Sequence, residues 1–363
     1  MDLRLPVEII ISIPHFIDGD FKTLAAVALV NRSLCEESRK LLYRTVGWMQ
    51  DTDPETFPWA NPRILSINPA LAKYVRTYTV QHFETEEADA ILAPLCPGPI
   101  LDAMVKLEHL DLDIFLNLPP TFLQNCPFQL DSLRWMDTLP FGAGSILYRF
   151  LESQTQLRKL EVETLDINSF VKHHPLPQTA CPNLQYLKSS YSVIRAILPC
   201  RKVSTLVWSS ITGSYSPVNE SGHLDREFSH LKAFTYLQWY FNVPSISSMA
   251  RYLANSLQYL KIFYDEDFVL TLPQFTSLMG LIFARQLNGR MLEWPSPLNT
   301  GRLFAQCPTL QFIDVQLGTT WSEKFYQRWI PDIDRQVGLR EAGQLLCLDI
   351  EDHKRPVRAL NLA

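Results

Sequence analysis

One six-residue phrase recurs along most of the chain, and it constrains the fold more than any other feature. The phrase is an apolar residue, two others, an apolar residue, one other and a final apolar residue. Its clearest copies begin at Leu107, Leu157, Val203, Leu257 and Leu310, and weaker copies begin at Val75, Leu130, Leu184, Leu231 and Leu278. From residue 107 onward the copies start about 25 residues apart on average, a period typical of repeat architectures.

The alternation within each phrase indicates how the units stack. Its last four residues alternate in character, as a short strand does when one of its faces is buried. Strands of successive units would pair in parallel and stack their apolar residues into a core that no single unit could build. Leucine, at 53 of 363 residues, is abundant enough to supply that core. Between the copies lie helical patterns, with Ser145 and Ser245 as expected N-caps of two helices.

The predicted fold class is therefore α/β, an array of short parallel strands with helices on the convex side. A generic α/β domain with leucine-rich strands is the alternative. Cys126, Cys181 and Cys307 each stand before a proline, shortly before a copy of the phrase. Proline after a helix is a stop signal, and a buried cysteine behaves as a small hydrophobe. These three cysteines are expected in the core.

The first fifty residues carry a different pattern, that of three short helices. Residues 5–13 predict the first, because a proline at its start and a glutamate in its first turn suit a helix N-terminus, and Ile9, Ile10 and Ile13 share one face. Pro14 is expected to end or kink this helix. After a turn at residues 18–20, a second helical pattern begins near Leu24 and a third covers residues 36–43. Helices this short bury little surface alone, so part of their apolar face is expected to contact a partner.

Several anchors in this region occur in the order found in the F-box. They are Leu5-Pro6-x-Glu8-Ile9-Ile10, Asp20-x-x-x-Leu24, Val27-x-x-Val30-Asn31-Arg32-Ser33 and Leu42-Tyr43-Arg44. Residues 3–46 thus resemble an F-box, particularly its fungal form, with Cys35 where the family usually has tryptophan and Pro14 where an aliphatic residue is commoner. The resemblance implies a module that binds the small adaptor subunit of cullin–RING ubiquitin ligases. A helical cap on the following domain is the alternative.

The repeats resemble the leucine-rich repeats that often follow an F-box. They lack the asparagine that this family shows three residues after the last apolar position of the phrase. Phe115, Leu165, Asp265 and Gly318 stand there instead, which predicts an irregular solenoid. Four prolines within residues 51–69 predict a stiff, extended or turn-rich linker. The predicted organisation is an F-box-like helical module at residues 1–50, a linker at 51–69 and a degenerate leucine-rich-repeat domain at 70–363.

Together, the resemblances imply the substrate-recognition adaptor of an SCF-type cullin–RING ubiquitin ligase. The surface implied for the ligase adaptor subunit comprises Leu5, Pro6, Ile9, Ile10, Ile13, Leu24, Val27, Val30 and Arg32. The outward strand positions expected to bind a target protein are His109, Asp111, Lys159, Glu161, Tyr186, Lys188, Tyr259, Lys261, Phe312 and Asp314, which mix both charge signs with aromatic residues. The alternative is a ubiquitin-independent interaction scaffold, in which the first 46 residues pack back against the repeats.

Motifs for catalysis, cofactors or metals do not appear in the sequence. Phosphate-binding glycine loops, zinc-protease motifs and nucleophile elbows are absent. His173-His174 has no third ligand at a suitable spacing, and the acidic runs 84–89 and 265–267 lack the spaced ligands of a calcium loop. The chain is therefore predicted not to be an enzyme and to hold no cofactor or metal.

Charge and cysteine usage bound the partners and the compartment. The net charge is −5, and a nucleic-acid binder usually has a basic domain, so no nucleic-acid partner is expected. The sequence has no run of about 18 uninterrupted apolar residues, so no membrane span is predicted. Seven cysteines without a Cys-x-x-Cys pair, and no signal-peptide pattern at the start, predict a reduced protein of the cytoplasm, the nucleus or both.

Overall fold

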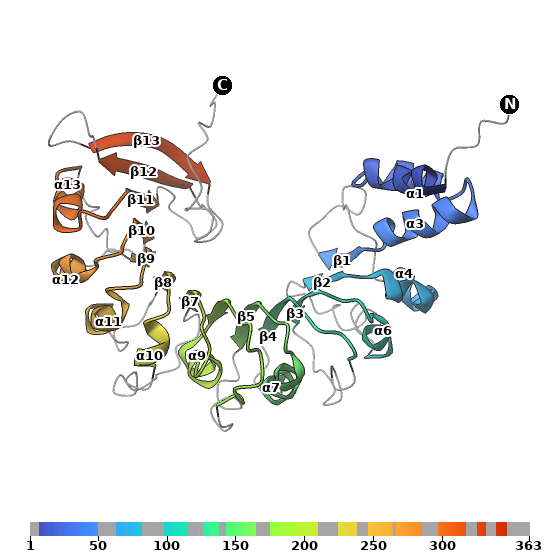
Figure 1. Ribbon diagram of the computed structural model, residues 1–363, viewed down its shortest axis with the longest axis horizontal. Coiled ribbons are helices and arrows are strands. Elements are labelled where there is room, and N and C mark those ends of the chain that lie inside the picture. Colours follow the sequence, from blue (N-terminus) through green and yellow to red (C-terminus); the bar gives the residue numbers. More distant parts are fainter. Residues whose placement is uncertain are drawn as a thin grey trace, which may run out of the picture. The chain divides into compact units, whose positions relative to one another are not determined.

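The computed structural model shows an α/β chain that divides into two compact units, residues 1–183 and 184–363 (Figure 1). The structure describes residues 7–49, 63–81, 98–114, 123, 126–137, 143–164, 175–209, 224–237, 246–263, 266–284, 297–316, 325–331 and 339–346. Each unit is built from short strands and short helices.

The first unit starts with three helices and continues into parallel strands. The helices are α1 (Val7–Phe16), α2 (Phe21–Val27) and α3 (Arg32–Leu42). The strands are β1 (Thr45–Met49), β2 (Thr77–Gln81), β3 (His109–Ile114), β4 (Ser132–Asp137) and β5 (Lys159–Thr164), which pair in parallel in chain order. Between them lie α4 (Arg63–Ile67), the 3-10 helix η1 (Pro69–Tyr74), α6 (Gly98–Ala103) and α7 (Ala143–Ser153).

The second unit repeats the strand–helix alternation and ends in a hairpin. Its parallel strands are β6 (Tyr186–Ser189), β7 (Thr205–Ser209), β8 (Ala233–Leu237), β9 (Tyr259–Phe263), β10 (Gly280–Ala284) and β11 (Phe312–Gln316). Strands β12 (Phe325–Pro331) and β13 (Leu339–Leu346) follow in antiparallel pairing. Helices α9 (Tyr191–Ile197), α10 (Asp225–Phe228), α11 (Ile246–Leu253), α12 (Glu266–Thr271) and α13 (Pro297–Gln306) lie along one side of the strands, and η3 (Leu272–Gln274) follows α12 (Figure 1). We call the opposite side of each sheet the strand face.

The ten copies of the sequence phrase form ten strands, which confirms the predicted stacking. Each strand begins two residues after the first apolar residue of its phrase. That first residue is buried in all ten copies, with at most 4% of its surface exposed. In the copy at Leu257, the residues Leu260 and Ile262 are also buried, whereas Tyr259 points to the strand face and is half-buried.

A recurring backbone contact fixes the register between neighbouring repeats. The carbonyl just before one strand accepts hydrogen bonds from two consecutive N–H groups of the next unit. Arg44 O accepts from the backbone N–H groups of Arg76 and Thr77 at 2.8 and 3.0 Å. The same arrangement recurs at the carbonyls of Arg76, Glu108, Asp131, Gln185, Ser204, Lys232, Gln258 and Met279. Because Arg44 takes part, β1 belongs to the repeating sheet although the sequence phrase was not recognised there.

The helical module is attached directly to the first sheet rather than through the linker alone. β1 pairs with β2 over five residues, and Tyr74 of η1 donates a hydrogen bond to Glu36 of α3 at 2.5 Å. Residues 51–62 of the predicted linker lie outside the described residues. Residues 63–67 form α4, so the extended conformation expected for that part of the linker is wrong.

Three local predictions about helix ends need correction. α1 runs through Pro14 to Phe16, so the helix does not end at the proline, although Pro14 has no N–H to donate to the carbonyl four residues before it. α3 begins at Arg32 rather than Glu36, since Asn31 caps it by accepting the Leu34 N–H at 2.9 Å. Ser145 is not an N-cap, because α7 already begins at Ala143. Ser245 lies outside the described residues.

Gln154 connects two successive repeats of the first unit through buried hydrogen bonds. Its side chain is fully buried, its Oε1 accepts the Leu130 N–H at 2.8 Å, and its Nε2 donates to Phe128 O at 3.3 Å. A buried backbone N–H left without an acceptor is costly. The neighbouring Gln129 makes similar cross-unit bonds, to Ser153 O and from Thr155 N–H, but in an exposed setting.

Replacing Gln154 with leucine is expected to lower the free energy of unfolding by about 1–3 kcal/mol, because Leu130 N–H and Phe128 O lose their buried partner. Urea unfolding followed by circular dichroism measures the change. Gln129→Leu is the matched control, and it should cost well under half as much since water can replace its bonds. Equal losses in the two variants would contradict this role for Gln154.

Candidate protein-binding surfaces

Five exposed apolar residues lie within the N-terminal helical module. Ile9, Ile13 and Phe16 follow one another at spacings of four and three residues, so they share one face of α1. Phe16 is 85% exposed, and in the turn between α2 and α3 Leu29 and Val30 are 88% and 68% exposed. We call these five residues the apolar helix surface. Large apolar side chains in such a set are typical of a surface that binds another protein.

The structure places seven of the nine residues implied for adaptor binding in three different environments. Ile9, Ile13, Val30 and Arg32 are exposed, Ile10 and Val27 are half-buried, and Leu5 and Pro6 lie outside the described residues. Leu24 is fully buried, so its predicted place on a docking surface is wrong. It lies in the core of the helical module together with Leu34 and Leu41, because α2 packs against α3.

Phe16 and Leu29 were not among the residues implied by the sequence. Phe16 is the seventh residue after Ile9, a spacing that places both on one helical face. This signal was lost because the helix was expected to end at Pro14. Leu29 directly precedes Val30 in the turn between α2 and α3, where helical periodicity gives no information.

The strand face of the first unit carries an ion-pair network across three strands. The register aligns Asp111, Arg134 and Glu161 on β3, β4 and β5. Arg134 Nη1 lies 3.3 Å from Asp111 Oδ2, and its Nε lies 3.9 Å from Glu161 Oε2. Lys159 Nζ lies 3.0 Å from Glu161 Oε1. These side chains, with His109 beside them on β3, are partly exposed, so four of the predicted target-binding residues share one charged surface.

The strand face of the second unit is partly closed. Three predicted target-binding residues are half-buried there, namely Tyr186, Lys188 and Tyr259. This is compatible with their predicted outward orientation. Lys261, Phe312 and Asp314 are buried, so their predicted exposure for target binding is wrong. Period-two alternation assigned them to the correct face of the sheet, but that face is covered toward β11 and β12.

A buried ion pair lies at the centre of this covered region. Arg328 on β12 donates to Asp314 on β11 through two bonds, Nε to Oδ1 at 2.7 Å and Nη2 to Oδ2 at 2.6 Å. The Arg328 guanidinium also lies 3.9 Å from the centroid of the Phe312 ring. Lys261 Nζ lies 4.9 Å from the centroid of the Tyr326 ring, which brings β9 and β12 together.

Gly280 allows this region to close. It stands between Tyr259 and Phe312 in the strand register. The two rings approach across it, with centroids 6.3 Å apart. A Cβ atom at residue 280 would lie 2.9 Å from Tyr259 Cδ1 and would overlap the Phe312 ring. A side chain at this position would therefore push the two rings apart.

The three cysteines that precede prolines fit structural positions rather than reactive ones. Cys181 and Cys307 are buried, which confirms two of the three predicted core cysteines, and their thiols donate to Leu151 O and Phe275 O, both at 3.4 Å. Cys126 is half-buried, and burial, aided by the nearby Asp102 carboxylate, raises the pKa of its thiol to about 12. This thiol is therefore protonated at neutral pH.

Within the described residues, no three His, Cys, Asp or Glu side chains are grouped closely enough to bind a metal ion. None of the helices in that part of the chain has the length and apolar character needed to cross a membrane. His173-His174, the acidic run 84–89 and Asp265 lie outside the described residues, and Glu266 and Asp267 stand in the first turn of α12.

Comparisons with known proteins give little similarity. No protein-family model matches the chain, and no curated protein matches it. Among solved structures, the chain is similar to a chain of the structure titled "Crystal structure of TLR13-ssRNA13 complex", with 12% sequence identity and a TM-score of 0.33. The match covers 77% of this chain and 48% of that chain, so this chain spans about half the length of its structural match.

Proposed function

We propose that this chain is the target-recognition adaptor of an SCF-type cullin–RING ubiquitin ligase. The N-terminal helices would bind the small adaptor subunit, and the strand face would bind a target protein. The repeats would be degenerate leucine-rich repeats. In this proposal the chain supplies geometry and no chemistry of its own, is not an enzyme, and acts in the cytoplasm, the nucleus or both.

The observation that carries the proposal is the apolar helix surface. Phe16, Leu29 and Val30 are largely exposed, and Ile9 and Ile13 lie on the same helical face as Phe16. Contact between water and this much apolar surface is unfavourable. Burial of the surface against a partner protein would therefore lower the free energy of the complex. The surface lies in the segment whose sequence resembles an F-box.

The target would be held by the open part of the strand face. In the first unit, His109, Asp111, Lys159 and Glu161 are partly exposed and offer charges of both signs. Tyr186, Lys188 and Tyr259 offer aromatic and basic groups in the second unit. Such a mixture suits a protein partner with a complementary charge pattern.

A scaffold that acts without ubiquitin is the second candidate, and one observation favours it. The helical module is fixed to the first sheet by the pairing of β1 with β2 and by the Tyr74–Glu36 hydrogen bond. A module that is built into the array suits a permanent structural cap. The two candidates differ in whether the apolar helix surface binds the ligase adaptor subunit.

We expect the purified full chain to bind the recombinant ligase adaptor subunit, and Ile9→Asp with Val30→Asp to weaken that binding about a hundredfold or more. Both side chains are exposed, so the loss would arise from a charge placed in an apolar interface. Biolayer interferometry measures the dissociation constants.

The matched control is Ile67→Asp with Val105→Asp, which changes two exposed apolar residues of the same unit outside the helical module. The control should bind like the unchanged chain. Absence of binding by the unchanged chain, or equal weakening in both double variants, would reject the ligase proposal and leave the scaffold.

A further inference from the structure

Residues 184–263 form a basic segment within an acidic chain. They contain eight Lys and Arg residues against three Asp and Glu residues, whereas the whole chain has a net charge of −5. The structure describes two of the three acids, and both have internal partners. Glu227 is buried and its Oε1 accepts the Cys200 N–H at 3.0 Å, and the Asp225 carboxylate is hydrogen-bonded to the Tyr252 hydroxyl. Neither of these two acids falls in the exposed class, so the exposed charged side chains among the described residues of this segment are basic.

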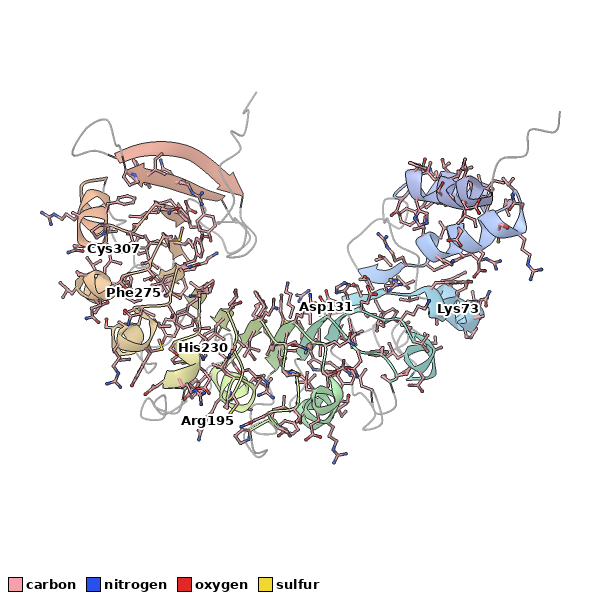
Figure 2. All side chains as sticks on the ribbon, in the orientation of Figure 1. Lys73, Asp131, Arg195, His230, Phe275 and Cys307 are labelled. Carbon is pink, nitrogen blue, oxygen red and sulfur yellow. The ribbon has the colours of Figure 1, made fainter. Side chains whose placement is uncertain are left out.

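Five basic residues of this segment are exposed, and they come from successive repeats of the second unit. Arg195 lies on α9, Arg226 on α10 and Arg251 on α11, while Lys202 and Lys232 lie just before β7 and β8. Figure 2 shows Arg195 beside α9 on the helix side of the unit. We call these five residues the basic surface. Among the charged residues described between 184 and 263, no carboxylate falls in the exposed class.

The neighbours of Lys232 along the edge of the sheet are neutral. Lys232 follows the first apolar residue of its phrase, and the corresponding residues in the adjacent units are Ser204 and Gln258. The backbone places them side by side, because Lys232 N–H donates to Ser204 O at 2.7 Å and Gln258 N–H donates to Lys232 O at 2.8 Å. Its charge is thus not balanced at these neighbouring positions.

The same phrase position in the first unit shows the opposite arrangement. In successive repeats of the first unit this position holds Arg76, Glu108, Asp131 and Arg158, and their charges pair. Arg76 forms an ion pair with Glu108, and Arg158 Nε lies 3.4 Å from Asp131 Oδ1. The repeat can therefore neutralise this edge internally, as the first unit does. In the second unit Lys232 is the one charged residue among the phrase copies at this position, so no carboxylate at this position is available to pair with it and an external anion could do so.

We propose that the basic surface binds an acidic segment of a partner protein, at a place separate from the apolar helix surface and the strand face. A nucleic acid fits less well, because single-stranded binding uses exposed aromatic rings on which bases stack. Among the described residues, the aromatic ring that follows Arg251 is Tyr252. It is half-buried, has the Arg251 guanidinium 4.4 Å from its centroid and bonds Asp225 through its hydroxyl.

The spacing of the units sets the length of the acidic segment. Packed helices lie about 8–10 Å apart, so α9 to α11 span roughly 20 Å. An extended chain of about six to eight residues covers that distance. Alternate residues of an extended segment point to the same side, so glutamates at every second position would face the basic surface.

The probe is a fluorescein-labelled peptide of about eight residues with alternating glutamate and serine, matched to the span above. Fluorescence anisotropy with the full chain should show binding that weakens as salt is added. Arg195→Glu with Lys202→Glu should weaken binding at least about tenfold, and Arg195→Gln with Lys202→Gln should weaken it less, because it removes charge without adding repulsion.

The first unit offers a matched control, Arg149→Glu with Lys106→Glu. Lys106 and Lys202 each stand directly before the first apolar residue of a phrase, Arg149 and Arg195 each stand eight residues before it, and all four are exposed. The control changes the net charge equally and should bind the peptide as the unchanged chain does. Equal weakening in test and control, no binding by the unchanged chain, or tighter binding of an oligothymidylate of the same length or of phosphatidylserine vesicles would overturn the proposal.

Discussion

Replacing Arg328 with methionine is expected to lower the free energy of unfolding by about 3–5 kcal/mol, because it leaves the Asp314 carboxylate buried without a counter-charge. The Asp314 side chain is fully buried and the Arg328 side chain is 6% exposed, so water cannot replace the two lost hydrogen bonds. Methionine keeps part of the apolar contact with the Phe312 ring, which isolates the charge effect. Urea unfolding followed by circular dichroism measures the loss.

The double variant Arg328→Met with Asp314→Leu separates charge from packing. Removal of both charges eliminates the cost of burying either one, so we expect the double variant to regain most of the stability that the single variant loses. A single variant as stable as the unchanged chain, or a double variant that is no better than the single one, would show that the ion pair does not hold β11 and β12 together.

Replacing Trp208 with alanine is expected to cost about 3–5 kcal/mol, because it opens a large cavity in the second unit. Trp208 is 1% exposed, stacks on Tyr191 with ring centroids 5.0 Å apart, and meets the edge of Tyr236 at 5.2 Å. Tyr236 is also buried, and this burial raises the pKa of its hydroxyl. The midpoint and slope of urea unfolding measure the change.

Two controls place limits on this prediction. Trp208→Phe retains an aromatic ring at the site and should lose less stability than the alanine variant. Leu270→Ala changes a residue that is 76% exposed and should lie within about 0.5 kcal/mol of the unchanged chain. If Trp208→Ala were as mild as Leu270→Ala, the aromatic cluster would not be part of the core.

The strands could be predicted from sequence because their signal is local and repeated. Each phrase combines a buried first residue with period-two alternation, and both properties arise from contacts with the immediately adjacent units. β1 was missed for a related reason. Tyr43, Val46 and Trp48 fit the apolar positions of the phrase, but α3 runs into them without a break and they were assigned to the helical module.

What covers a face could not be predicted from the same pattern. Alternation places Lys261 and Asp314 opposite the leucine core, but their burial depends on β12, which is antiparallel and lies beyond the last phrase. Gly280 gives no periodic signal, and its role appears only when Tyr259 and Phe312 lie on either side of it. Leu24 was misplaced because a helix with apolar residues does not reveal which of them face its neighbours and which face a partner.

The pairing of β1 with β2 has a consequence for deletion experiments. An open strand edge presents unpaired N–H and C=O groups and promotes self-association. In the intact chain β1 protects this edge of β2. Removal of residues 1–50 would therefore replace β1 as the edge strand by an unpaired β2, and a loss of solubility in that variant would be mistaken for lost partner binding. Point substitutions on the exposed face of α1 leave the edge protected, so they can separate the two effects where truncation cannot.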